Sequence, residues 1–84
     1  MKLISEDFVD DENCGLVFKY EFLQSAEKSE SPYILRTELF KEGVKTGEAE
    51  EGFNTLEKAV KLYGLAIKTK ITPLNLKYIK EDMG

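Results

Sequence analysis

Two stretches of the sequence, residues 14–23 and 33–40, alternate their side chains with the two-residue period of a β-strand. In the first stretch Leu16, Phe18, Tyr20 and Phe22 share one face. In the second, Tyr33, Leu35, Thr37 and Leu39 do so. The serine-rich, charged segment 25–31 stops at Pro32 and is typical of a loop between hairpin strands. We therefore expect an antiparallel pair of strands with a face that another layer covers.

A third strand is predicted over residues 44–50, after a tight turn at residues 41–43. This stretch is polar and interrupted by Gly47, and charged side chains are typical of a sheet edge, where they discourage pairing with other chains. The pattern for a further short strand over residues 3–8 is faint, and the acidic run 10–13 suits a solvated loop. The sequence thus predicts a sheet of about three strands.

Two helices are predicted after the strands. Asn54, with Glu57 three residues later, fits a capping box. The apolar residues behind it recur at helical spacing on one face: Leu56, Ala59, Val60, Tyr63, Ala66 and Ile67. Thr72 followed by Pro73 is a second start signal, because proline is favoured in the first helical position. The order β-β-β-α-α predicts an α+β fold, in which an antiparallel sheet has both helices packed on one face.

The chain of 84 residues is short enough that we expect one domain over residues 1–84. This domain would consist of an acidic N-terminal segment (1–13), the antiparallel sheet (14–53) and a helical part (54–84). The sequence lacks an apolar run of the roughly 18 residues that a membrane-spanning helix requires. Acids also stand where a signal peptide has its apolar run, so we expect a cytoplasmic protein with no membrane partner.

The segment 71–82, Ile-Thr-Pro-Leu-Asn-Leu-Lys-Tyr-Ile-Lys-Glu-Asp, resembles the C-terminal signature of a small uncharacterised bacterial domain family of unknown function. In that signature a helix leads into an aliphatic-Ser-Pro tripeptide, then a histidine and a leucine, and an acidic pair ends it. The chain departs from the signature at four positions, which are Thr72, Asn75, Tyr78 and Lys80. The resemblance covers about the last third of the chain and implies a fold element without an activity.

Catalytic chemistry is limited by the absence of histidine and by a single cysteine, Cys14. Ser-His-Asp and Cys-His arrangements, histidine-bearing zinc sites and iron-sulfur motifs are thereby excluded. Carboxylate pairs remain, but they lie in polar runs where nothing raises the pKa of one member for general acid catalysis. We expect Cys14 to be a buried thiol at the start of a strand. The sequence therefore predicts a protein that is not an enzyme.

Residues 10–21 match a calcium-binding loop at Asp10, Gly15 and Glu21. The match fails at Cys14 and Phe18, which offer no oxygen ligand, and the second half of the loop overlaps the clearest strand. The glycines at 43, 47 and 52 stand among acids, which repel phosphate. We predict no metal site and no cofactor.

The net charge of −4 is unevenly distributed. Residues 1–31 hold three basic and eight acidic side chains, whereas residues 54–84 hold six basic and three acidic ones. The lysines of the C-terminal part are best interpreted as a solvated helix surface, because the rest of the chain would repel nucleic acid. Direct binding of nucleic acid is therefore not expected.

Ten acidic residues are expected in loops or on the edge strand: Asp7, Asp10, Asp11, Glu12, Glu27, Glu30, Glu42, Glu48, Glu50 and Glu51. In such places carboxylates present charge that resembles a phosphate backbone to a basic cleft. Small inhibitors of nucleic-acid enzymes, such as the anti-CRISPR proteins of phages, act in this way as a functional class. The leading hypothesis is thus a non-enzymatic acidic module that inhibits or regulates a nucleic-acid-handling partner protein by occupying its basic surface.

The alternative hypothesis is a self-associating structural or accessory domain. Leu23, Ile34 and Phe40 lie on the second face of the two clearest strands, and if exposed they would form the interface of a homodimer. An acidic surface that serves solubility alone also fits the composition. These alternatives remain open at the level of the sequence. A third possibility, an enzyme that uses carboxylates alone, would require two acids in a deep pocket, for which a chain this short has little room.

Overall fold

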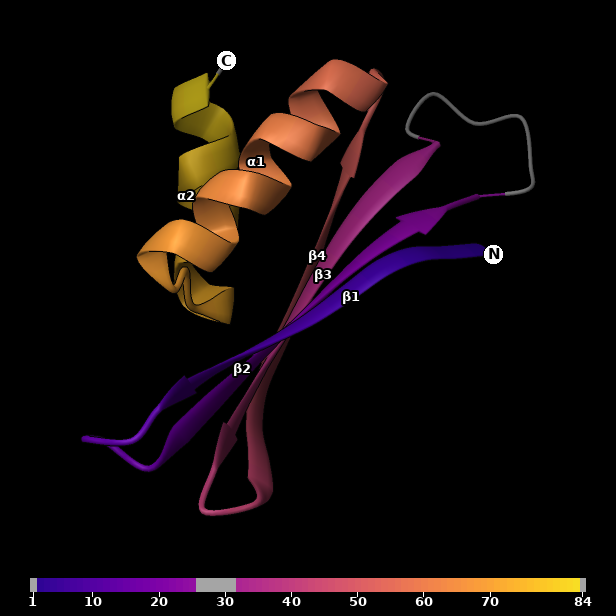
Figure 1. The fold of residues 1–84 in the computed structure, drawn as a ribbon. Coiled ribbons are helices and arrows are strands. Elements are labelled where there is room, and N and C mark those ends of the chain that lie inside the picture. The colour runs from indigo at the N-terminus through magenta and orange to yellow at the C-terminus, as the bar shows by residue number, and fades with distance from the viewer. Residues whose placement is uncertain (1, 26–31, 84) are drawn as a thin grey trace.

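The computed structural model describes residues 2–25 and 32–83, and in this part of the chain a four-stranded antiparallel sheet precedes two helices (Figure 1). The strands are β1 (Lys2–Asp11), β2 (Leu16–Gln24), β3 (Tyr33–Lys41) and β4 (Val44–Phe53), and they are neighbours in sequence order. The helices are α1 (Leu56–Thr69) and α2 (Pro73–Met83). The predicted α+β class is confirmed.

The predicted number of about three strands is wrong, because residues 2–11 form a complete strand. β1 pairs with β2 from Lys2 opposite Gln24 to Asp11 opposite Leu16, with one bulge between Leu3 and Ser5. Its pattern is faint in the sequence because two residues of its helix-covered face, Ser5 and Asp7, are polar. Asp10 and Asp11, expected in a loop, are the last two residues of this strand.

Two tight turns connect β1 to β2 and β3 to β4 at the same end of the sheet. Positive φ angles are found at Gly15 (66°), Glu42 (51°) and Gly43 (82°). The two turns are joined by a hydrogen bond of 3.1 Å from the Glu42 amide to the Gly15 carbonyl. β4 then forms one edge of the sheet, as its polar sequence predicted.

The first helix differs from its prediction in its cap and in its buried face. Thr55, rather than Asn54, is the N-cap, and its side chain accepts a hydrogen bond of 3.3 Å from the Lys58 amide. The buried residues of α1 are Ala59, Leu62, Tyr63 and Ala66. Leu56 and Val60, which were expected on the buried face, remain half exposed (50% and 53%). The second helix begins at Pro73, as predicted.

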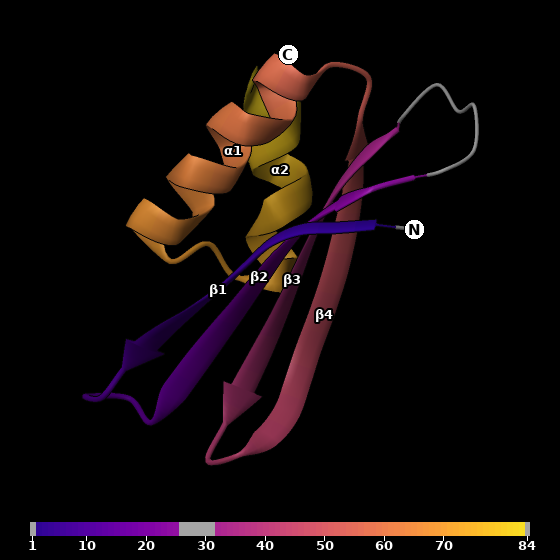
Figure 2. The same ribbon diagram turned by 45° about the vertical axis from the view of Figure 1, so that its right-hand side comes forward.

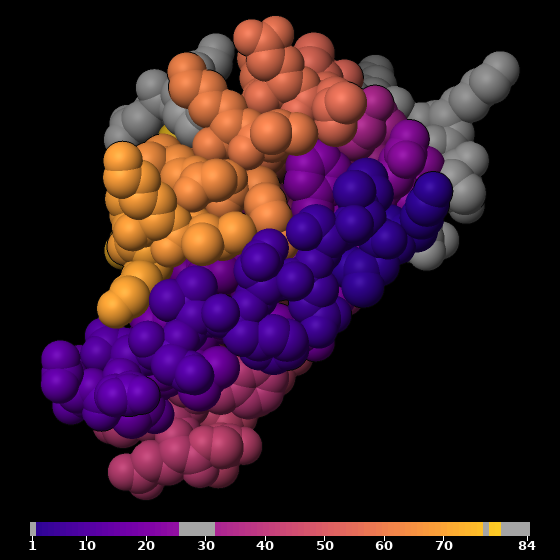
Figure 3. Space-filling view, in the orientation of Figure 1, coloured from indigo at the N-terminus to yellow at the C-terminus, as the bar shows by residue number. Residues whose placement is uncertain are grey.

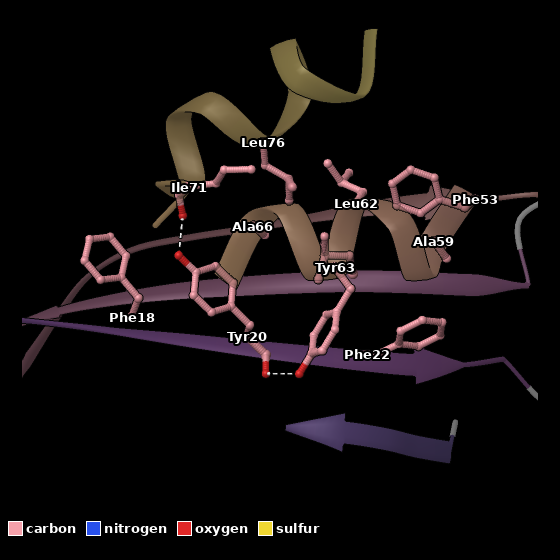
Figure 4. Close-up of a cluster of buried hydrophobic side chains, with 11 residues drawn as sticks. Phe18, Tyr20, Phe22, Phe53, Ala59, Leu62, Tyr63, Ala66, Ile71 and Leu76 are labelled. Carbon is pink, nitrogen blue, oxygen red and sulfur yellow. Dashed lines mark hydrogen bonds between the residues drawn. The ribbon is translucent and has the colours of Figure 1, made fainter. Parts of the chain in front are cut away.

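Both helices cover the same face of the sheet (Figures 1 and 2). The core beneath them contains these residues: Phe18, Tyr20, Phe22, Leu35, Phe53, Ala59, Leu62, Tyr63, Ala66, Ile71 and Leu76. Two tyrosines, Tyr20 and Tyr63, connect the sheet to the helical layer through hydrogen bonds of their hydroxyl groups (Figure 4). Tyr20 donates a 2.9 Å hydrogen bond to the Ile71 carbonyl, and burial raises the pKa of Tyr20 to about 12. Within residues 2–25 and 32–83, no helix covers the opposite face of the sheet.

Candidate protein-binding face

The face of the sheet turned away from both helices, called the open face below, carries alternate residues of all four strands. Two rows cross its middle, Glu6-Glu21-Arg36-Glu50 and Phe8-Lys19-Glu38-Glu48. Two further rows lie at its ends, Leu3-Leu23-Ile34-Gly52 and Asp10-Val17-Phe40-Lys45. Charged side chains therefore occupy the middle of the open face, and apolar side chains lie toward both ends.

Glu21 is the centre of the charged band. It is buried (8% exposed) although no helix covers it. The Arg36 guanidinium lies 3.7 Å from Glu21 Oε1 and 3.4 Å from Glu50 Oε2, and Lys19 Nζ lies 3.8 Å from Glu21 Oε1. Both basic residues of the central rows are thus engaged by carboxylates of the same face.

Lys45, the third basic residue of the open face, is also paired within it. Its ammonium group contacts Glu48 and lies 3.4 Å from Glu38 Oε2. The hydrogen bond to Glu48 raises the pKa of Lys45, and the same bond lowers the pKa of Glu48. Among the described residues, Glu6 and Asp10 are the acids of the open face that form no ion pair.

An apolar cluster of Phe8, Val17 and Phe40 lies beside the charged band. Val17 is directly opposite Phe40, and Phe8 is diagonal to Val17 across the β1–β2 ladder. Phe8 is 59% exposed, and Lys19 Nζ lies 5.9 Å from the centre of its ring. The open face therefore has an exposed aromatic side chain surrounded by charged groups.

Two of the predicted acidic contact residues, Asp7 and Asp11, lie instead on the helix-covered face of β1 and are half-buried. Asp7 accepts a 2.5 Å hydrogen bond from the Tyr63 hydroxyl, whose pKa is raised by burial and by this bond. Asp11 lies 3.9 Å from the Lys70 ammonium group. Asp7 therefore bonds β1 to α1, and Asp11 lies beside the residue that caps the end of α1.

The other predicted acids fall into four groups. Asp10, Glu48 and Glu50 lie exposed on the open face. Glu12 and Glu42 are exposed in the two joined turns, whereas Glu51 is half-buried on the helix-covered face. Glu27 and Glu30 lie outside the described residues. The structure thus gathers part of the predicted set along one face and one end of the sheet.

Two expectations about single residues are wrong. Cys14 is exposed in the turn between β1 and β2 rather than buried. Leu23, expected among exposed residues of a dimer interface, is only 6% exposed because it stands between Leu3 and Ile34 in its row. Phe8 was not singled out from the sequence because the pattern of its strand is faint, and the Glu21–Arg36 pair was not because the sequence does not fix the register of the expected hairpin.

Within residues 2–25 and 32–83, no group of three or more acidic, cysteine or histidine side chains has an arrangement that would hold a metal ion. Neither helix in this part of the chain has the length and apolar character needed to cross a membrane. Comparisons of the chain with family models, with curated proteins and with solved structures found no match. The resemblance of residues 71–82 to a bacterial domain family stays a prediction.

Proposed function

We propose that the protein is a non-enzymatic binding module that occupies a basic surface of a partner protein with its open face. The observation that carries this proposal is the exposed ring of Phe8, which lies beside the half-buried Val17 and Phe40 and has carboxylates around it. Specific protein interfaces commonly combine an aromatic centre with a polar rim. The open face has this composition, and no helix of the described chain covers it.

The charge of the open face favours a basic partner. Its three basic side chains, Lys19, Arg36 and Lys45, are each paired with carboxylates of the same face. Glu6 and Asp10 therefore remain for cations of a partner, and uncompensated carboxylates attract a basic surface over distances of about 10 Å at 0.1 M salt. The same carboxylates would repel nucleic acid, so the proposed partner is a protein.

In its sharper form, the proposal is that the protein inhibits a nucleic-acid-handling partner, as phage or mobile-element inhibitors of the anti-CRISPR type do. Basic clefts that hold nucleic acid are the protein surfaces most complementary to such a face. Glu12 and Glu42, in the two joined turns, extend the acidic surface beyond the end of the open face. A cytoplasmic location, as predicted from the sequence, belongs to this proposal.

The proposal is tested by affinity capture of the tagged protein from cells that carry its gene, followed by mass spectrometry. Phe8→Ala removes the exposed ring, and Leu74→Ala is the matched control, because Leu74 is 84% exposed on α2. We expect a basic, nucleic-acid-handling protein to be retained by the wild type and by the control. Phe8→Ala should weaken its binding at least tenfold, which is typical of a central aromatic contact.

Salt provides the second readout, since raising it from about 0.1 M to about 1 M shortens the Debye length from about 10 Å to about 3 Å. A partner held through carboxylates should be released in this range, and in the sharper form the captured partner should have lost its nucleic acid. A partner that is retained equally by Phe8→Ala, or whose binding is insensitive to salt, would contradict the proposal.

A further inference from the structure

β1 is an edge strand, and its outer backbone groups have no neighbouring strand among the described residues. Next to this edge, α1 carries two exposed apolar side chains and a third, Ile67, that packs against the core and is only partly covered by it. Leu56 and Val60 are 50% and 53% exposed, and Ile67 is half-buried. We call these three residues the α1 flank. An unpaired strand edge and an uncovered apolar helix surface thus occur in the same region.

Two contacts place the α1 flank on the β1 side of the helix. Tyr63 bonds to Asp7, and Lys70 lies beside Asp11, so α1 runs alongside β1 in the same direction. At about 100° per residue, the residues of the flank lie next to Tyr63 around the helix, on the side away from Leu62. Figure 3 shows α1 and β1 side by side along the front of the molecule.

The helix surface next to the α1 flank is exposed at Gly64. A Cβ atom added at Gly64, which neighbours Val60 on the helix surface, would meet no atom within 4 Å. The outer edge of β1 is regular from residue 5 to residue 11, after its single bulge. This length offers room for the main-chain hydrogen bonds of an added strand, whose side chains on one face would pack against α1.

We propose that the β1 edge and the α1 flank together bind an extended segment of a partner protein, which adds to the sheet as a further strand. The inference rests on the proposed function, because it specifies the chemistry of the partner. The α1 flank, however, belongs to this site alone and not to the open face.

The two faces of the added strand have different surroundings, which determine the sequence of the segment. On the helix side, the β1 acids Asp7 and Asp11 are already engaged by Tyr63 and Lys70, so the flank presents an apolar surface. On the open side, the unpaired Glu6 and Asp10 and the ring of Phe8 favour cations. Since side chains alternate along a strand, the segment alternates aliphatic residues with lysine or arginine.

A second copy of this chain does not fit the same edge. β1 carries four acids, Glu6, Asp7, Asp10 and Asp11, and a single basic residue, Lys2. Pairing two such strands would bring like charges opposite each other, which is destabilising. The charge of β1 therefore selects a basic strand from another protein.

The experiment titrates the full chain with a blocked eight-residue peptide in which valine and lysine alternate. Val60→Glu introduces a charge into the α1 flank, and Leu65→Glu is the matched control. Leu65 is 38% exposed and lies about 140° further around the same helix, so both variants change the net charge equally. We expect the peptide to bind, Val60→Glu to raise its Kd at least tenfold, and Leu65→Glu to change it less than twofold.

Strand addition requires the peptide backbone, which provides an independent readout. A peptide with alternate amides methylated on the edge that faces β1 should lose binding, and the unmodified peptide should slow amide hydrogen exchange in residues 5–11. Equal binding of the methylated peptide, of a peptide with four valines followed by four lysines, or of Val60→Glu would overturn the inference.

The same variants separate this inference from the proposed function. Loss of peptide binding in Val60→Glu, together with capture of a partner that Val60→Glu still retains, would support the strand-addition site and show that the open face binds its partner without the α1 flank. A wild-type chain that captures a basic partner through the open face but does not bind the alternating peptide would refute the strand-addition site alone.

Discussion

At the scale of single residues, the centre of the helix-covered face contains a buried hydroxyl group that forms no hydrogen bond with the described residues. Thr37 is fully buried opposite Tyr20 and Ala49, and its Oγ1 finds no hydrogen-bond partner within the described residues. Valine has nearly the same shape without the polar atom, and burying an unsatisfied hydroxyl costs about 1–3 kcal/mol. We expect Thr37→Val to raise the free energy of unfolding by about 1 kcal/mol in urea denaturation.

Thr46 offers the matched control for this substitution. It is exposed on β4, and its Oγ1 donates a 3.3 Å hydrogen bond to the Leu39 carbonyl. Thr46→Val removes a satisfied, solvated hydroxyl, so stability should stay the same or fall slightly. A loss of stability in Thr37→Val as large as that of a broken buried hydrogen bond would mean that its hydroxyl is paired in solution.

At the scale of elements, the sequence predicted the parts whose periodicity is carried by apolar side chains. β2, β3 and the existence of α1 were identified because Phe18, Phe22, Leu35 and Ala59 repeat at strand or helix spacing. The full length of β1 was not identified, because the polar Asp7 interrupts the apolar pattern of its covered face. The hydrogen bond that allows Asp7 to lie there comes from Tyr63, 56 residues further along the chain. Likewise, which side chains are neighbours on the open face depends on the register between strands, and periodicity within one strand does not reveal that register.

The start of α1 illustrates how two adjacent cap residues compete. Asn54 is the better N-cap by preference, yet Thr55 has the extended backbone (φ −126°, ψ 146°) and accepts from the Lys58 amide. We expect Thr55→Ala to lower the free energy of unfolding by about 1 kcal/mol. Asn54→Ala, at an equally exposed position, should change it by less than about 0.5 kcal/mol. Thermal denaturation measures the loss of stability in each variant. A larger loss in Asn54→Ala than in Thr55→Ala would mean that Asn54 is the N-cap in solution.

At the scale of the whole molecule, the helices divide the surface into parts with different roles. They cover one face of the sheet completely enough to bury Tyr20, Leu35 and Leu62, and they leave the open face and the β1 edge uncovered. An exposed edge strand normally invites pairing between copies, and natural proteins counter this with charge. Because the acids of β1 exceed its single lysine, the net charge of the molecule is concentrated where self-association would otherwise begin.

We therefore expect the protein to be a monomer of 9.6 kDa at neutral pH, because the acids of β1 prevent self-association. Replacing Glu6 and Asp10 together by serine removes two charges from the edge, and we expect this variant to dimerise as its concentration rises. The pair Glu12→Ser and Glu42→Ser removes the same charge from the turns and should remain monomeric. Size-exclusion chromatography with light scattering measures all three masses. A wild-type dimer whose amide protection falls on residues 5–11 would show that β1 selects its own copy, and it would favour the structural role over binding of a basic partner.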